Sequence, residues 1–375
     1  MTLRRVCFAL VFVGALGLSF LLIMEVLVRI FQPQVLPRDI PSLWTQDPTI
    51  SWRHRTDIHV VANTGERDVD VCIDGKGDRV ACGVPARTDC KKRILAIGDS
   101  YAEALAVPYD QTVWARIDAD TGACTDDSGV SAYYLSQYVV MARERLGAPG
   151  AHYDLVIVSL YLGNDLIDDP DKLPKPQDVQ YHPVRLFPAG LSERAIWEWF
   201  YPWNSWLESH SEFYVAGRYA VRRFRDPGHV GIYGVPDVVR RSAFTKALRD
   251  GTARGLQEIA QEAHRHGARM LVSLVPHASQ VQDPDGSVLL HGLPQLTGDI
   301  DMDMSSREFA PQLEAIPEID RVVDLLPPLR AKRDQPLTGK YDTHLSPQGH
   351  AVWFDAVREP VRELLAAGPP APRSP

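Results

Sequence analysis

Four short apolar runs recur along the chain, each bounded by polar or turn-forming residues. Runs of this length without a polar face are typical of buried strands in a parallel sheet. The runs occupy residues 93–97, 155–160, 270–275 and 322–326. Apolar residues recur at helical spacing over residues 243–266, and Gly267 then supplies a signal for the end of the helix. Strands that alternate with helices predict an α/β fold whose parallel sheet is covered on both faces.

The first apolar stretch of the chain is too long for a strand. Residues 6–24 are uncharged and almost wholly apolar, and Arg4 and Arg5 precede them. A membrane-spanning helix needs about 20 such residues, and residues 14–17 form a poor signal-cleavage site. Residues 1–31 are therefore predicted to form a cytoplasmic start and an uncleaved anchor rather than a cleaved signal peptide. The positive-inside rule favours a single pass with the N-terminus in the cytoplasm.

Residues 32–92 separate this anchor from the first buried strand. Four prolines between positions 33 and 48 predict a stiff lead-in. Alternating apolar and polar residues at 58–61 and 68–73 predict two short strands. We expect a small β-rich extension that packs against a main domain over residues 93–366. Residues 367–375, rich in proline and alanine, are expected to be a disordered tail.

Four cysteines beyond the anchor bear on the compartment. Cys72, Cys82, Cys90 and Cys124 permit three disulfide pairings, among which the sequence does not choose. An even set of cysteines downstream of an anchor favours an oxidising compartment, periplasmic or extracellular. The alternative is four reduced, buried cysteines in a cytosolic domain. No cysteine or histidine cluster has the spacing of a zinc site, so neither a metal nor a cofactor is expected.

The composition argues against one broad class of partner. The chain has 375 residues, of which 45% are hydrophobic and 23% are charged, an ordinary balance for a globular protein. Its 40 basic and 48 acidic residues give a formal net charge of −8, and no basic stripe appears. These features argue against a nucleic-acid-binding protein.

Ser100 directly follows the first apolar run, within the sequence Gly-Asp-Ser-Tyr. A helix-permitting stretch comes next, so Ser100 is predicted on a turn between the carboxyl end of a strand and the start of a helix. Open α/β sheets bind ligands at that edge. A serine there can place its hydroxyl in a cleft and its amide N–H toward a developing oxyanion. Taken alone, the same sequence is also a common turn.

Two further positions could donate hydrogen bonds at the same edge. Gly129 lies in a turn after the first strand, where a glycine lets backbone N–H groups approach a ligand closely. Asn164 follows the second apolar run, and its amide could donate into the same cleft. The simpler interpretations are a plain turn glycine and a helix N-cap asparagine.

The sequence Asp342-Thr343-His344 lies near the end of the chain. Ser346-Pro347 follows it and predicts a helix start, because serine is a good N-cap and proline suits the first helical position. In a loop that enters a helix, Asp342 could accept a hydrogen bond from one nitrogen of His344 while the other nitrogen faces Ser100. The alternative for His344 is a bond to the backbone at the helix entry.

Taken together and in this order, these motifs resemble the SGNH/GDSL hydrolase superfamily over about residues 93–366. The resemblance implies a flavodoxin-like, five-stranded parallel sheet. It also implies that Ser100 is the nucleophile, that His344 is its base and that Asp342 orients His344. The amides of Ser100 and Gly129 and the side chain of Asn164 would form the oxyanion hole. Tyr101 stands where the family has leucine, a difference expected to be minor.

The resemblance implies a serine-dependent ester hydrolase, an esterase or deacylase, acting on acylated carbohydrate of the envelope or on exopolysaccharide. The acid lies two residues before the histidine, which looks like the branch that contains alginate-type O-acetyltransferases. The alternatives are therefore an O-acetyltransferase that moves an acyl group onto a polysaccharide and a catalytically inactive, glycan-binding envelope protein. An insertion at about 168–240 carries an aromatic stretch at 196–206. That stretch could stack on sugars, lie at a membrane interface or form a local core.

Overall fold

The computed structural model describes most of the chain. The described residues are 3–34, 36, 43–64, 67–85, 87, 90–173, 203, 206–207, 209–225, 235–339 and 343–370. The chain divides into two compact units. The smaller unit comprises Met1–Asp39, Asn63–Gly65 and His182–His229, and the larger comprises Ile40–Ala62, Glu66–Tyr181 and Val230–Pro375.

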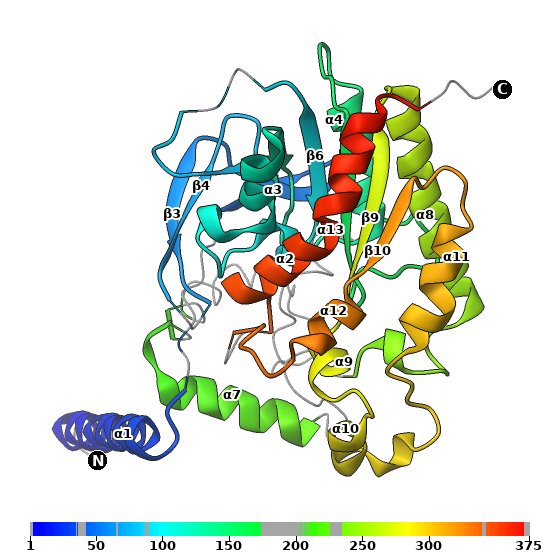
Figure 1. Cartoon of the computed structure of the whole chain (residues 1–375). Coiled ribbons are helices and arrows are strands. Elements are labelled where there is room, and N and C mark those ends of the chain that lie inside the picture. The colour runs from blue at the N-terminus through cyan, green and yellow to red at the C-terminus, as the bar shows by residue number, and fades with distance from the viewer. Residues whose placement is uncertain are drawn as a thin grey trace. The chain divides into compact units, whose positions relative to one another are not determined.

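The larger unit is built around an eight-stranded mixed sheet (Figure 1). Its parallel part has five strands, in the spatial order β10 (Arg321–Asp324), β9 (Arg269–Val275), β8 (Leu155–Tyr161), β6 (Arg93–Gly98) and β7 (Cys124–Asp127). Beyond β7 the sheet continues with three antiparallel strands, β5 (Arg79–Val80), β4 (Val69–Ile73) and β3 (Ile58–Ala62). A separate antiparallel pair is formed by β1 (Trp44–Asp47) and β2 (Ser51–His54).

The sheet therefore has eight strands where the sequence predicts five. The β-rich extension does not pack on a face of the sheet but lengthens it, because Arg79 of β5 pairs in register with Asp127 of β7. β7 itself lacks an apolar run, since it contains two adjacent aspartates. One of them, Asp126, forms an ion pair of 2.7 Å with Arg93 on the neighbouring strand β6. Partners of this kind, distant in sequence, make a polar segment a stable strand.

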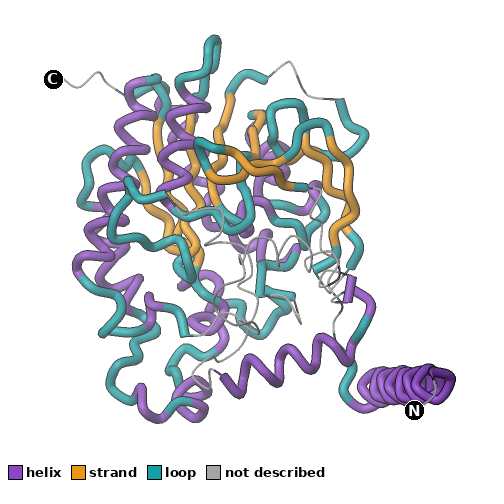
Figure 2. Tube along the Cα trace, turned by 180° about the vertical axis from the view of Figure 1, so that it is seen from behind, coloured by secondary structure: helices purple, strands orange, loops and turns teal. Residues whose placement is uncertain are grey.

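Helices cover both faces of the sheet (Figures 1 and 2). Successive residues of β6 point to opposite faces, so Leu95 and Ile97 join one hydrophobic cluster while Ile94 and Ala96 join another. The first cluster includes residues of α4 (Leu135–Leu146), α8 (Lys246–Arg265) and α11 (Ala310–Glu314). The second includes residues of α3 (Val113–Thr121), α12 (Leu326–Ala331) and α13 (Pro347–Ala367). The shorter helices are α2 (Ser100–Glu103), η1 (Tyr109–Gln111), η2 (Asp237–Val239), α9 (Ala278–Gln282), α10 (Ser287–Gly292), η3 (Pro294–Leu296) and η4 (Ser305–Phe309).

Two long helices agree closely with the sequence pattern. The helical spacing at 243–266 corresponds to α8, which Thr245 caps by accepting a 3.2 Å hydrogen bond from the N–H of Leu248. The last helix, α13, begins at Pro347, and the hydroxyl of Ser346 accepts from the N–H of Gly349 at 3.2 Å. The start of α13 is thus fixed three residues beyond His344.

The four cysteines of the larger unit form two disulfides. Cys72 pairs with Cys82 and Cys90 pairs with Cys124. The first links β4 to the turn after β5, and the second links the segment before β6 to the start of β7. Each disulfide restricts the unfolded chain and so stabilises the edge of the sheet that carries the extension.

The smaller unit contains two long described helices, α1 (Leu3–Phe31) and α7 (Glu212–Arg225). Among the described residues, one helix is long and apolar enough to cross a membrane, with Val11–Phe31 as the candidate span. Of the aromatic stretch 196–206, the described residues are Trp203 and Trp206, and both are exposed. The rest of that stretch, and positions 371–375 of the predicted tail, lie outside the described residues.

Candidate active site

Ser100 is the first residue of α2, directly after the tight turn at Asp99 that follows β6. The strand ends at Gly98, and Asp99 caps the helix by accepting a 2.9 Å hydrogen bond from the N–H of Tyr101. A Cβ atom at Gly98 would lie 2.6 Å from the Cβ of Ala102, which is too close for any side chain. Glycine therefore permits the sharp turn that the sequence predicts, and Ser100 is brought to the carboxyl edge of the sheet.

The structure brings Ser100 and His344 together across 244 residues of sequence. The Nε2 atom of His344 lies 2.7 Å from the Oγ atom of Ser100, within hydrogen-bond distance. His344 comes from the segment that leads into α13, as the helix-start signal indicates. A serine hydroxyl held against an imidazole nitrogen is the arrangement that allows the imidazole to remove the hydroxyl proton.

Tyr101 holds the histidine segment in place, a role that the sequence did not reveal. Its hydroxyl donates a 3.1 Å hydrogen bond to the carbonyl oxygen of Thr343, and its ring centroid lies 4.8 Å from that of His344. The ring of Tyr161 stacks on that of Tyr101, with 4.0 Å between the ring centroids. The leucine of the family pattern could not donate this hydrogen bond. Tyr101 therefore makes a contact in this site that a leucine could not make.

Asp342, the predicted partner of His344, lies outside the described residues. Two other carboxylates near the site have partners of their own. Asp165 accepts hydrogen bonds from the hydroxyl of Tyr138 at 2.7 Å and from the N–H of Tyr161 at 2.6 Å. Asp99 serves as the cap of α2. The assignment of Asp342 as the orienting acid remains a prediction.

Gly129 is placed beside the turn that carries Ser100. A Cβ atom on Gly129 would lie 2.6 Å from the backbone nitrogen of Glu103 and 2.7 Å from the Cβ of Ala102, so only glycine fits. The neighbouring loop is tied to β6, because the N–H of Val130 donates to the carbonyl of Gly98 at 3.0 Å. The N–H of Gly129 itself donates to Oδ1 of Asp127 at 3.3 Å, a long hydrogen bond within its own loop.

Asn164 lies in the turn after β8, the strand that pairs with β6. Its side chain is exposed, and no helix begins within the described residues 165–173. The N-cap interpretation of Asn164 is therefore wrong. Its place at the same carboxyl edge as Ser100 is the one expected for a donor to the cleft.

A buried carboxylate links the turns of Ser100 and Gly129. Glu103 accepts a 2.7 Å hydrogen bond from the N–H of Ser131, just after Gly129, and bonds the hydroxyl of the same residue. Its other oxygen lies 2.7 Å from Nε2 of His54 on β2. The side chains of Glu103 and His54 are fully buried. The segment before the catalytic motifs therefore contributes to the site, although its sequence carries no recognisable chemistry.

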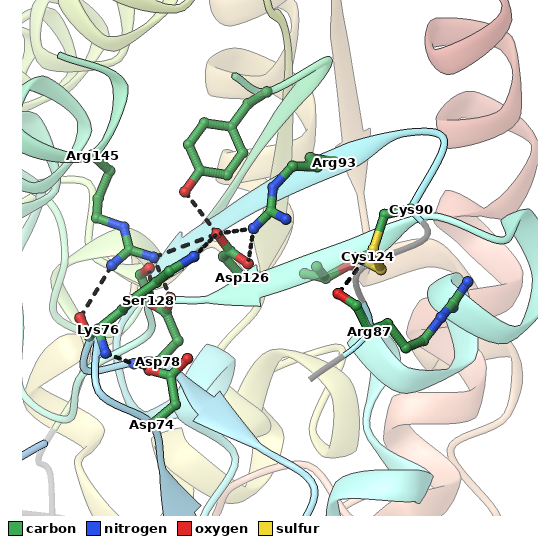
Figure 3. A network of polar contacts seen from close by, with 12 residues as sticks. Asp74, Lys76, Asp78, Arg87, Cys90, Arg93, Cys124, Asp126, Ser128 and Arg145 are labelled. Carbon is green, nitrogen blue, oxygen red and sulfur yellow. Dashed lines mark hydrogen bonds and ion pairs between the residues drawn. A yellow bond between two sulfur atoms is a disulfide. The ribbon is translucent and has the colours of Figure 1, made fainter. Parts of the chain in front are cut away.

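A second polar network fastens the loop of Gly129 to the extension (Figure 3). Ser128, which precedes Gly129, donates a 2.5 Å hydrogen bond to Asp78, and Arg145 of α4 pairs with the same aspartate. Arg145 also lies 3.6 Å from Asp126 of β7. The charged side chains at this edge neutralise one another and hold β5 and β7 together.

Asp99 and Asp165 have buried carboxyl groups near Ser100, and their pKa values depend on each other. Burial raises the pKa of Asp99 to about 7, and the negative charge of Glu103 adds to the effect, while the N–H of Tyr101 and the charge of His344 oppose it. Burial also raises the pKa of Asp165 well above its usual range, and the charge of Asp99 raises it further. A negative charge on either carboxyl group therefore disfavours ionisation of the other.

A small cleft lies beside Tyr101 and Thr343. Leu329, Leu337 and Leu345 give it an apolar wall, with Arg333 among the polar residues that line it. Its contact with the residues that position His344 makes it a candidate for holding part of a substrate. Among the described residues, His59, Cys72 and Cys82 are near enough to one another to suggest a metal site, but the two cysteines form a disulfide.

Comparison with known proteins found similarity to solved structures. No protein-family model matches the sequence, and no curated protein matches it. The structure is similar to a member of the lipolytic G-D-S-L family from Veillonella parvula DSM 2008, at 12% identity and a TM-score of 0.37, covering 72% of this chain and 97% of that one. It is also similar to an acetyl xylan esterase, at 12% identity and a TM-score of 0.36, covering 72% of this chain and 99% of the other.

A third similar structure is a carbohydrate esterase family 2 enzyme with a carbohydrate-binding domain from Corynascus thermopiles (Myceliophthora fergusii). It shares 14% identity at a TM-score of 0.39, covering 76% of this chain and 69% of that one. Of these three similar structures, one is a member of the lipolytic G-D-S-L family and two are esterases.

Proposed function

We propose that the protein is a serine-dependent ester hydrolase, an esterase or deacylase. One observation carries the proposal: the 2.7 Å approach of the Ser100 hydroxyl to Nε2 of His344 at the carboxyl edge of the sheet. His344 removes the hydroxyl proton as Oγ attacks the ester carbonyl, and the protonated imidazole then gives that proton to the leaving alkoxide. Water, activated by the same histidine, attacks the acyl-enzyme and releases the acid.

The tetrahedral intermediate needs donors for its oxyanion. We assign this role to the amides of Ser100 and Gly129 and to the side chain of Asn164. The close fit of Gly129 against α2 and the exposed position of Asn164 at the same edge support the assignment. Rotation of the Gly129 peptide away from Asp127 would free its N–H for the substrate. Asp342 is assigned to accept from His344 and to stabilise the imidazolium.

We also propose how the chain is organised. The parallel strands, numbered along the chain, lie in the order 2-1-3-4-5, which supports a flavodoxin-like core. The proposed divisions are an anchor at 1–31, a lead-in and extension at 32–92, a catalytic domain at 93–366 with an insertion at about 168–240, and a tail at 367–375. An apolar N-terminal helix and two disulfides support a membrane-anchored protein with its N-terminus in the cytoplasm and its catalytic domain in the periplasm or outside the cell.

The proposed substrate is an acylated carbohydrate of the envelope or an exopolysaccharide. The second candidate function is transfer of the acyl group to a sugar hydroxyl. It is favoured by the spacing of Asp342 and His344, which resembles that of envelope-polysaccharide O-acetyltransferases. Both reactions share the acyl-enzyme on Ser100, and they differ in whether water or a sugar hydroxyl attacks it.

The purified full chain in detergent, given an aryl acetate with and without an oligosaccharide acceptor, tests both functions. Free acetate in both mixtures supports hydrolysis, whereas acetylated sugar supports transfer. Ser100→Ala should abolish turnover and the covalent adduct with a fluorophosphonate, as seen by mass spectrometry. Ser242→Ala is the matched control, because Ser242 is an exposed serine bonded to Asp299. An intact fold with neither product, or normal turnover by Ser100→Ala, would refute the proposal.

A further inference from the structure

Helix α7 has one apolar stripe and one basic stripe. Apolar residues or glycine occupy positions 213, 217, 220, 221 and 224, the spacing of a single helical face. Arginines at 218, 222 and 225 follow the adjacent stripe. The helix carries four arginines and a single acidic residue, Glu212, although the whole chain has a net charge of −8. A strongly basic amphipathic helix in an acidic protein requires an explanation.

The apolar stripe of α7 is partly uncovered within its own unit. Phe213 and Gly217 are half-buried, but Val221 is 43% exposed and Ala220 is exposed as well. The guanidinium of Arg218 lies 6.0 Å from the ring centroid of Tyr214, along the boundary between the two stripes. Exposed apolar residues beside a row of arginines are typical of helices that lie in a membrane interface.

The start of α7 is fastened to the candidate membrane span. Glu25 of α1 accepts hydrogen bonds from the N–H groups of Glu212 and Phe213, at 3.0 and 3.1 Å, and from the hydroxyl of Ser211 at 2.8 Å. Glu25 therefore caps the N-terminus of α7, where a negative charge is favourable. Arg29 pairs with Glu25 at 2.8 Å and donates to the carbonyl of His210 at 3.0 Å.

This junction lies near the end of the span rather than at its middle. Glu25 is six residues before Phe31, the last residue of α1, and at a rise of about 1.5 Å per residue it lies roughly 9 Å from the helix end. Polar and charged contacts are acceptable at that depth, close to the headgroups. Trp203 and Trp206 of the same unit are 59% and 54% exposed, and exposed tryptophans are enriched at membrane interfaces.

We propose that α7 lies along the surface of the membrane that α1 spans, with its arginines on anionic phospholipid headgroups and its apolar stripe toward the acyl chains. The charge of the helix and its attachment to the span favour a lipid surface over a protein partner. The proposal rests on the proposed membrane anchor. It gives the insertion a function separate from the chemistry at Ser100: α7 is a second, lipid-selective contact with the bilayer.

Nitroxide depth measurements on the full chain test the proposal. In a Cys7→Ser background, single labels are placed at Val221→Cys on α7, at Leu18→Cys on α1 and at Val288→Cys on α10. Residues 18 and 288 are 61% and 73% exposed and serve as membrane and solvent references. The protein is reconstituted in phosphatidylcholine nanodiscs with or without phosphatidylglycerol. Power saturation then compares the accessibility of each label to oxygen and to a nickel chelate.

In nanodiscs with phosphatidylglycerol, the label at 221 should favour oxygen over nickel, as the label at 18 does, while the label at 288 favours nickel. Phosphatidylcholine alone, or Arg218→Glu, should shift the label at 221 toward nickel, and Arg218→Lys should restore the membrane value.

A solvent-like value at 221 beside a membrane-like value at 18 would overturn the α7 proposal and leave the anchor intact. Solvent-like values at both positions would overturn the anchor as well. A label at 221 shielded from both reagents would indicate a protein contact instead, which also overturns the proposal. A membrane-like value at 221 that responds neither to phosphatidylglycerol nor to Arg218→Glu would overturn its preference for anionic lipid.

Discussion

The backbone N–H of Ser131 donates a 2.7 Å hydrogen bond to the buried carboxylate of Glu103. Glu103 ends the short helix that begins at Ser100, and Ser131 lies two residues after Gly129. This contact therefore connects the turn of the proposed nucleophile with the turn of a proposed oxyanion donor. The other oxygen of the Glu103 carboxylate lies 2.7 Å from Nε2 of His54.

Glu103→Gln should weaken both the fold and catalysis. The amide can satisfy only one of the two donors, His54 and Ser131, and leaving a buried donor without its acceptor costs about 1–3 kcal/mol. We expect that loss in the free energy of unfolding by urea titration, together with a lower kcat and a nearly unchanged KM. Glu144→Gln is the control, because its 3.3 Å pair with Arg53 is partly exposed and should contribute less than about 1 kcal/mol. Equal effects of the two variants would contradict the role given to Glu103.

Tyr101→Phe should slow the reaction without removing the fold. The change deletes the hydroxyl that donates to Thr343 and keeps the ring that stacks on Tyr161. One lost hydrogen bond is worth about 1 kcal/mol, so we expect kcat to fall roughly fivefold to tenfold. Tyr101→Leu should lower kcat further, because the stacking on Tyr161 is lost too. Tyr153→Phe removes a hydroxyl bonded to Asp126 away from this site and should leave kcat unchanged. A Tyr101→Phe enzyme with parental kcat would show that the hydroxyl does not position His344.

The apolar strands and the ordered motifs could be recognised in the sequence because both are local patterns. An apolar run identifies β8 wherever its neighbours lie, and Ser346-Pro347 marks the start of α13 by itself. The meeting of Ser100 with His344 was expected because Ser100 follows the carboxyl end of a strand and His344 lies in the loop that enters a helix. Local patterns were therefore sufficient for the centre of the site.

The parts that the sequence did not predict depend on partners far along the chain. β7 is polar, and its Asp126 is stabilised by Arg93, 33 residues earlier. Tyr101 acts through Thr343, 242 residues later, so its replacement of leucine looked unimportant. Glu103 reaches His54 in a segment without any motif. A single sequence carries no signal for such pairs, because each residue alone is compatible with many environments.

His350 should make the stability depend on pH in a defined direction. It is buried, its Nδ1 accepts a 3.2 Å hydrogen bond from the N–H of Val113, and burial lowers its pKa to about 3. In the unfolded chain a histidine binds a proton below about pH 6.5, whereas the folded state does not. The unfolded state then holds more protons, so stability falls as the pH drops from about 6 toward about 4, by up to about 1.4 kcal/mol per unit.

Urea titrations across this pH range measure the effect. His350→Gln should lower the free energy of unfolding at neutral pH. It should also reduce the slope of that free energy against pH by the amount that one proton contributes. His59→Gln, at an exposed histidine, should leave the dependence as it is in the parent. An unchanged acid slope in His350→Gln would show that His350 is not the group whose protonation opposes folding.

Asn164→Ala should lower kcat about 10²- to 10³-fold with little change in KM. A single oxyanion donor is typically worth ~2.7–4 kcal/mol in the transition state and little in the ground state. Steady-state kinetics with an aryl acetate measure both constants. Because the side chain is exposed, the fold should be retained, which circular dichroism checks. A raised KM with a normal kcat would make Asn164 a substrate-binding residue and remove it from the oxyanion hole.

Asp342→Asn addresses the third member of the proposed triad. The carboxylate is expected to accept a hydrogen bond from His344 and to hold the ring in the tautomer whose unprotonated Nε2 faces Ser100. An amide in its place can favour the wrong tautomer, so kcat should fall about 10³- to 10⁴-fold while the fold is retained. Asp334→Asn, at an exposed aspartate earlier in the same connection to α13, is the matched control and should act like the parent. If Asp342→Asn also acts like the parent, His344 takes its orientation from the contacts of Tyr101 instead, and the site works as a serine–histidine pair.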